Sequence, residues 1–344
     1  MKIFAVLALA GCMLAGCRNH NIPDVSRIAV DARIERFDRF LFQQTDTTAA
    51  ASGFQQLQSA FPYFTNDFVT HILELPPAVA PYTDTASAAT FSELKHFIRL
   101  TRPIYDSLSG SFDEKTTARE LERAFKYLKY YFPAYPIPHL VTYIGPFNAP
   151  GVAVTDQAIA IGLQLYGGKN FSFYTSEEGI ALFPAYISKR FEQQYIPANV
   201  MTAVIEDIYP GQSTGRPLID QMVEKGKQWY LLDKLLPETP DSIKTGYTDR
   251  QLDWCRNNEG LIWDFFLQSN ELYTTEPAFI QNWIGEAPST QEMSPSSPGN
   301  IGQWVGWRIV QAYSNKHPEL GLDALMKKGT KEIFLGSKYK PRYK

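Results

Sequence analysis

HLVTYI at residues 139–144, GVAV at 151–154 and AIAIGL at 158–163 are three short runs of small, β-branched and aromatic residues. Runs of this length are typical of strands when turn-forming residues separate them. NAPG at 148–151 and TDQ at 155–157 supply such turns. The three runs therefore predict a small antiparallel meander of strands.

Helical periodicity dominates on both sides of the meander. Leu121, Phe125, Leu128 and Phe132 form the clearest apolar stripe, ending before a proline and capped by Thr116 or Thr117. Further helices are predicted at 50–132, 196–209, 217–236, 248–267, 276–285 and 301–313. We therefore expect an α+β fold, mostly helical, forming one domain over residues 31–344.

Gly302 and Gly306 lie four residues apart in the last of these helices. Two glycines at this spacing leave one side of a helix without side chains, so another helix can approach closely. We expect this pair to serve packing.

The first residues have the pattern of a secretory signal. Lys2 precedes an apolar run at 3–14 that is too short to span a bilayer, which needs about 20 residues. Leu14-Ala-Gly-Cys17 then resembles the lipobox of bacterial lipoproteins. This implies cleavage after residue 16, a palmitate-type lipid on Cys17, and a tether at 17–30. Cys12 is a second match, but cleavage there leaves a very short apolar core.

Composition excludes several classes of protein. Hydrophobic residues make up 44% of the 344 residues, enough for a sizeable core. The 33 Lys and Arg residues against 36 Asp and Glu residues give no basic excess, so we expect no nucleic-acid partner. After processing, Cys255 is the one unmodified cysteine, and it cannot form an internal disulfide.

No strong catalytic motif is present in the sequence. His71, His96 and His139 fall in separate predicted elements, so we expect neither a metal nor a cofactor. Glu206 and Asp207 on one helix, and Asp220 and Glu224 on the next, could face a common cleft and act in acid–base chemistry. The interpretation that we favour is a solvated helix face, with Glu224 paired to Lys227 or Gln228.

Several blocks of the sequence resemble the gliding-motility lipoproteins of the GldB type. They occur in conserved order along nearly the whole chain after residue 17: IERFD (34–38), FPYF (61–64), YFP (131–133), LIDQM (218–222), WYLLDKLLP (229–237), WCRNNE (254–259), SPGNIGQWVGW (297–307) and SKYKP (337–341). The resemblance implies a membrane-anchored component of a gliding and secretion apparatus.

This family is similar, more distantly, to predicted zinc peptidases with a zincin-like fold. There, a helix after the strands carries His-Glu-x-x-His, whose histidines hold zinc while the glutamate acts as base. Ile205-Glu-Asp-Ile-Tyr209 is the best match here: Glu206 keeps the base position, but Ile205 and Tyr209 replace the histidines. The next helix has Glu224-Lys225 where such relatives tend to have Glu-Gly, so the site is expected to be vestigial.

Three functions follow from these patterns. The first is a non-catalytic, zincin-like lipoprotein of the cell envelope, facing the periplasm and acting through contacts with other envelope proteins. The second is an active metal-dependent hydrolase with unusual ligands. The third is a nutrient-binding lipoprotein of the SusD kind, although the helical repeats of such proteins are not seen.

Overall fold

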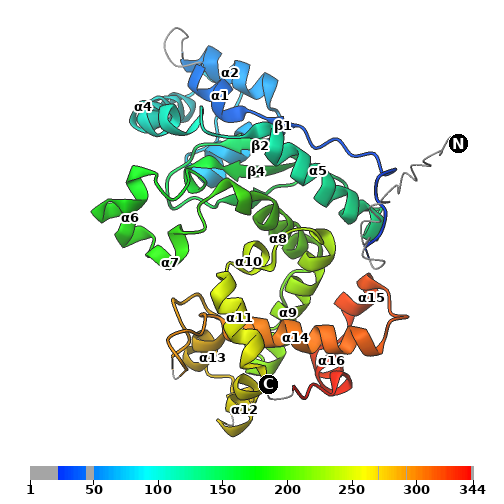
Figure 1. Cartoon of the computed structure of the whole chain (residues 1–344). Helices are drawn as coiled ribbons and strands as arrows, with labels where there is room; N and C mark the ends of the chain where they lie inside the picture. The colour runs from blue at the N-terminus through cyan, green and yellow to red at the C-terminus, as the bar shows by residue number, and fades with distance from the viewer. Residues whose placement is uncertain (1–21, 44–49, 270, 292, 342–344) are drawn as a thin grey trace, which may run out of the picture.

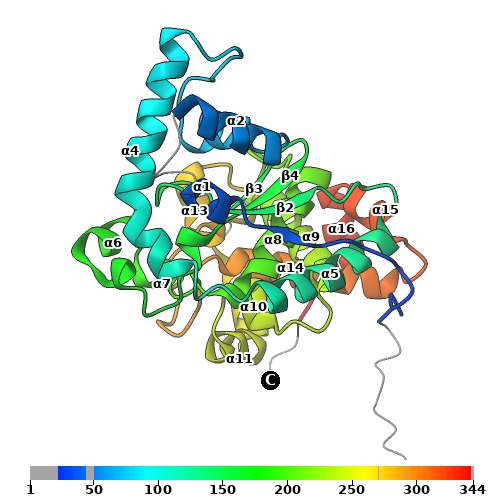
Figure 2. The same ribbon diagram turned by 90° about the horizontal axis from the view of Figure 1, so that it is seen from above.

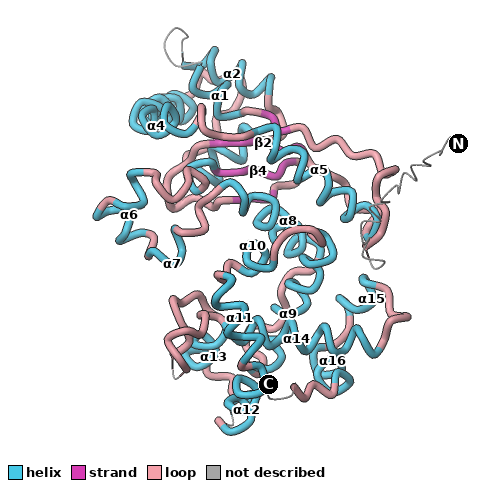
Figure 3. The backbone as a smooth tube through the Cα atoms, viewed as in Figure 1, coloured by secondary structure: helices cyan, strands magenta, loops and turns pink. Residues whose placement is uncertain are grey.

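The computed structural model describes residues 22–43, 50–269, 271–291 and 293–341. The predicted signal peptide and the lipidation site Cys17 lie outside these residues. Within them, no helix is long and apolar enough to cross a membrane. Figure 3 shows helices surrounding a small sheet in one half of the molecule and helices alone in the other.

The first half of the chain contains the four strands. Its main elements are β1 (Ile34–Glu35), α1 (Phe37–Gln43), α2 (Ala50–Ala60), α3 (Thr65–Asp67), the π-helix η1 (Phe68–Ile72), α4 (Thr85–Leu108), α5 (Glu114–Tyr131), β2 (His139–Tyr143), β3 (Val152–Val154), β4 (Ala158–Gly162), α6 (Glu177–Leu182), α7 (Ala185–Ser188) and α8 (Ile196–Ile208).

The second half of the described chain is helical throughout. Its elements are α9 (Leu218–Leu235), α10 (Asp241–Thr245), α11 (Asp249–Asn257), α12 (Glu259–Gln268), α13 (Pro277–Ile284), α14 (Ile301–Lys316), α15 (Leu322–Lys327) and α16 (Thr330–Ser337). Short 3₁₀ helices, η2 (Leu163–Leu165), η3 (Ser172–Thr175), η4 (Gln193–Tyr195) and η5 (Glu271–Tyr273), connect elements of both halves.

The sheet is mixed, so the predicted antiparallel meander is wrong. The strand order is β1-β2-β4-β3; β1 and β4 both run parallel to β2, and only β3 and β4 pair antiparallel. The connection at 144–151 carries the chain past the position of β4, so that the β3–β4 hairpin places β4 between β2 and β3. All residues of β4 are buried, as is usual for a parallel strand covered on both faces.

Two helix predictions also differ from the structure. The segment predicted as one helix over 248–267 is two, because Asn258 leaves the helical conformation between α11 and α12. At the start of α5, Asp113 is the N-cap rather than Thr116 or Thr117. Its carboxylate accepts a hydrogen bond from the Thr116 backbone N–H, which satisfies one of the free amides of the first turn.

A hydrophobic cluster surrounds the sheet, which we call the sheet cluster. It extends from Val25 to the sheet and to α8, and it includes the fully buried rings of Phe37, Phe64 and Phe68. The Phe37 ring lies edge-on to each of the other two, with centroids 4.9 Å apart. Figure 1 shows α1 and α2 on one side of this sheet and α8 on the other.

A second hydrophobic cluster, which we call the helical cluster, lies among the elements from α9 to α16. Helix α9 contributes to both: Leu218, Ile219, Met222 and Val223 belong to the helical cluster, and Leu231, Leu232 and Leu235 to the sheet cluster. The helix therefore runs from the interior of one half of the molecule into the interior of the other, as Figure 1 shows.

Glycines bring α9 and α14 into backbone contact. A Cβ atom on Gly306 would lie 1.7 Å from the Met222 carbonyl oxygen, and one on Gly226 would lie 2.1 Å from the Gly306 carbonyl carbon. A Cβ on Gly302 would lie 2.9 Å from the Trp283 carbonyl oxygen. The packing role predicted for Gly302 and Gly306 is confirmed.

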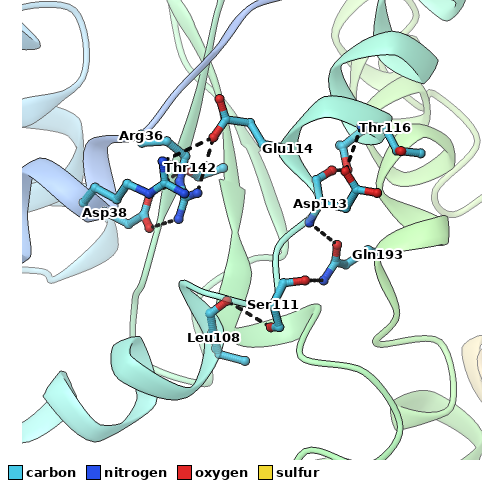
Figure 4. A network of polar contacts seen from close by, with 11 residues as sticks. Arg36, Asp38, Leu108, Ser111, Asp113, Glu114, Thr116, Thr142 and Gln193 are labelled. Atoms are coloured by element: carbon cyan, nitrogen blue, oxygen red, sulfur yellow. Dashed lines mark hydrogen bonds and ion pairs between the residues drawn. The ribbon is translucent and has the colours of Figure 1, made fainter.

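A buried ion pair lies at the junction of β1 and α1, as Figure 4 shows. Arg36 donates hydrogen bonds to both carboxylate oxygens of Asp38, at 2.8 and 2.6 Å, and Asp38 is fully buried. Thr142 of β2 donates to the same carboxylate at 2.5 Å, and Arg36 lies 3.5 Å from Glu114 of α5. Arg36 and Asp38 are thereby connected to β2 and α5 at once.

Candidate functional site

A pocket of about 250 Å³ lies where α8 and α9 face α10 and the start of α14. The predicted vestigial site should lie here, because Glu206 is on α8 and Lys225 is on α9. The pocket is lined by Asn199, Thr202, Ile205 and Glu206 of α8, by Lys225, Gln228, Trp229 and Leu232 of α9, and by Arg190, Tyr195, Ile243, Lys244, Thr245, Gly246, Glu286, Asn300 and Gln303.

Ile205 lies at the wall of this pocket and is 1% exposed. Its side chain belongs to the sheet cluster, and the apolar α8 face that places it there also buries Met201 and Val204. An isoleucine has no lone pair to offer a metal or a substrate. At this point of the wall the site is apolar.

Glu206 also lines the pocket, with 53% of its side chain exposed. The nearest cation is Lys225, whose Nζ lies 3.7 Å from the Glu206 carboxylate and donates to Gln228 Oε1 at 3.1 Å. The Lys225 ammonium group is thus the charged group nearest to the Glu206 carboxylate in the pocket. Its positive charge disfavours a second cation beside it.

Tyr209 is directed away from the pocket. Its hydroxyl donates a hydrogen bond to Asp323 of α15 at 2.6 Å, and its ring lies edge-on to Phe132. Burial, together with the hydrogen bond to Asp323, raises the pKa of Tyr209. The phenol therefore stays protonated and bonded to α15.

Glu224 likewise does not reach the pocket. It pairs with Lys227 at 3.1 Å, and Lys227 in turn donates to the Met326 carbonyl oxygen at 2.9 Å. The predicted pairing with Lys227 is confirmed, but the Glu224 side chain is only 15% exposed, so the prediction of a solvated face is wrong at this residue. The structure therefore brings Ile205, Glu206 and Lys225 together but places Tyr209 and Glu224 on the side that faces α15.

Two ion-pair groups in the pocket were missed by sequence reasoning. Arg190 donates to both oxygens of Glu286, at 3.1 and 3.0 Å, across 96 positions of sequence. Lys244 pairs with Asp233 and Asp241. The one local signal was Gly246, which has a left-handed conformation and lies against the Arg190 side chain.

The residues of this pocket do not fit a zinc ion. Zinc requires nitrogen, sulfur or carboxylate donors converging within about 2.0–2.3 Å. Of the aligned positions, Ile205 has no donor atom, the Tyr209 hydroxyl is held by Asp323, and Lys225 is cationic. Across the described part of the chain, no group of three or more His, Cys, Asp or Glu side chains is placed to hold a metal ion.

Comparison with known proteins gives one match. The family model described as "Gliding motility protein GldB" matches residues 18–341. Searches of curated proteins and of solved structures found no match. Since the match covers nearly the whole sequence, the chain belongs to the gliding motility protein GldB family.

Proposed function

We propose that the protein is a lipid-anchored, non-catalytic component of a gliding-motility and secretion apparatus, acting through contacts with other envelope proteins. The observation that carries the non-catalytic part is the chemistry of the α8–α9 pocket. Ile205 and Tyr209 take the positions predicted for the two histidines: Ile205 has no donor atom, and the Tyr209 hydroxyl is bonded to Asp323. The Lys225 ammonium group lies beside Glu206, where its charge disfavours a metal cation. The relation to zincin-like peptidases itself remains a prediction.

Membership of a gliding-motility lipoprotein family suggests the cell envelope as the location. The family match starts at residue 18, directly after the predicted lipidation site Cys17. We propose that the lipid holds the protein on a membrane, with the folded part facing the periplasm. We also propose that residues 31–344 act as one domain, because α9 contributes to both hydrophobic clusters.

Glu206→Gln is expected to leave the cellular function intact. Loss of a catalytic base costs about 10²–10⁴ in rate, whereas this half-exposed carboxylate forms a long ion pair with Lys225, which contributes little to stability. The measurement is rescue of a deletion strain by the variant, at equal protein level in the membrane. Exposed Glu178→Gln, remote from the pocket, is the matched control.

A failure of rescue by Glu206→Gln at normal level, while Glu178→Gln rescues, would contradict the non-catalytic proposal. Elemental analysis of the purified wild-type protein gives an independent arm. Metal bound at one equivalent, and lost in the Glu206→Gln protein, would favour a hydrolase instead.

Cys17→Ala is expected to abolish lipid attachment, because the thiol that receives the acyl group is gone. Labelling cells with a radioactive or alkyne fatty acid measures this directly. The matched control is Cys12→Ala, which should retain the label in full. Label that persists in Cys17→Ala and disappears in Cys12→Ala would move the anchor to residue 12.

A further inference from the structure

One side of α16 is exposed and has an unusual composition. Lys331 and Leu335 are four residues apart, so they lie along one face of the helix, and Leu335 is 60% exposed. Exposed Lys338 follows directly as the C-cap residue, in a left-handed conformation. Ile333 and Ser337 are fully buried and pack the opposite side. Two lysines thus flank an exposed leucine on a surface that contributes nothing to the core.

Positive charge is concentrated around this face. Residues 322–341 contain five lysines and only two acidic residues, in a chain whose net charge is −3. Both acidic residues are already paired, Asp323 with Lys327 and Glu332 with Lys328. Lys331, Lys338 and Lys340 are exposed and form no ion pair with any residue in the described ranges.

The start of the described chain lies on the same side of the molecule. Figures 1 and 2 both show the segment after residue 22 beside α15, at the right of each view. Val25 of that segment and Met326 of α15 belong to the same sheet cluster. Helix α15, which directly precedes α16 in the chain, therefore lies beside the point where the chain would leave for its membrane anchor.

The length of the tether limits how far this side can stand from the bilayer. Cys17 precedes residue 22 by five positions, which reach at most about 18 Å when fully extended. A lipid on Cys17 therefore keeps this side of the protein close to the headgroups. The attraction between exposed lysines and anionic lipids acts within about a Debye length, roughly 8 Å at physiological salt.

We propose that the exposed surface formed by Lys331 and Leu335 of α16, and by Lys338 and Lys340 after its C-terminal end, docks on the anionic phospholipid surface of the membrane that holds the anchor. The lysines bind the phosphate headgroups, and Leu335 enters the interface between them. This inference rests on the proposed lipid anchor. It adds an orientation: α15 and α16 face the bilayer, and α4, α6 and α7 point away from it.

The test is lysine acetylation of the full processed protein reconstituted in vesicles, followed by mass spectrometry. One vesicle preparation is phosphatidylcholine alone, and the other contains about one third phosphatidylglycerol. Lys331 and Lys338 should react at least about fivefold more slowly on the anionic vesicles, and 1 M salt should remove the difference. Lys95 and Lys169, which are exposed elsewhere, should react equally on both.

Two double variants with the same change in net charge distinguish binding through this surface from a general attraction of the whole protein to anionic lipid. Lys331→Glu with Lys338→Glu should abolish the protection of Lys340, while Lys95→Glu with Lys169→Glu should leave it intact. Thermal unfolding of each variant checks that the fold is retained. If the first variant does not fold, the lipid dependence in the wild-type protein decides alone.

If Lys331 and Lys338 react on both vesicle types as fast as Lys95 and Lys169 do, the inference is overturned, and this surface would be left to a protein partner. If Lys331 and Lys338 react equally slowly on both vesicle types, the inference is also overturned, since the tether alone would then explain their slow reaction. The intact mass of the same sample reports the lipid on Cys17. An acylated protein without protection thus contradicts the docking face alone, whereas an unacylated protein contradicts the anchor and this inference with it.

Discussion

Replacing Asp38 with Ala is expected to lower the free energy of unfolding by about 3–5 kcal/mol, because it leaves a buried arginine without its partner. The Arg36 side chain is only 7% exposed, and its remaining carboxylate neighbour, Glu114, is 3.5 Å away. Thr142 loses its acceptor as well. Urea unfolding, followed by far-UV circular dichroism, measures the change.

The position of the tryptophans makes this experiment a test of domain structure too. All six lie between residues 229 and 307, so their fluorescence reports on the second half of the chain. If residues 31–344 form one domain, the Asp38→Ala transition should shift equally by fluorescence and by circular dichroism. A fluorescence transition that stays at the wild-type position would show that the helical cluster unfolds separately.

Asp31→Ala is the matched control for this change. Asp31 pairs with Arg33, but both side chains are well exposed, at 63% and 86%. An exposed pair of this kind contributes at most about 1 kcal/mol. Equal losses for Asp31→Ala and Asp38→Ala would contradict the role given to burial.

Gly306→Ala should destabilise the protein by about 3 kcal/mol or prevent folding. The new methyl group would lie 1.7 Å from the Met222 carbonyl oxygen, which is a severe overlap. The backbone of a packed helix cannot move aside as a side chain can. Helices α9 and α14 would have to separate, which opens the helical cluster around Trp304 and Val305. The midpoint of thermal unfolding and the soluble yield measure the effect.

Gly211→Ala tests whether the effect belongs to the site or to the substitution. Gly211 is exposed, and an added Cβ would meet no atom within 4 Å. The change should be neutral or stabilise slightly, by up to about 1 kcal/mol, because alanine restricts the unfolded chain. A stable Gly306→Ala protein would show that the crossing of α9 and α14 is looser than described.

Local patterns predicted most of the helices and the positions of three strands, but not how β2 pairs in the sheet. The stripe ending at Phe132, the span of α8 and the two glycines of α14 follow from spacing within one segment. Strand pairing depends on where the connection between two strands leads. Nothing in the sequence of the 144–151 loop indicates that β3 lies one strand further from β2 than β4 does. The unbroken apolar run of β4 was the available clue, because a strand exposed on one face would alternate.

The candidate site could also be predicted only in part, because only some of its residues are related by spacing within neighbouring segments. Ile205, Glu206 and Lys225 lie on two consecutive helices, so their meeting in one pocket needs only that α8 and α9 pack together. Arg190 and Glu286 come from loops that no periodicity connects. The direction of Tyr209 toward Asp323 depends on α15, which lies more than a hundred residues away in sequence.

Helix α9 has a mechanical consequence for a protein held by its N-terminal end. The helix is 18 residues long, or about 27 Å, and side chains near its two ends are buried in different clusters. With the lipid anchor proposed above, tension would enter the sheet cluster, which Val25 and the sheet share, and α9 would connect that cluster to the helical cluster. The two halves would thus share such a pull through a continuous helix instead of bending at a loop.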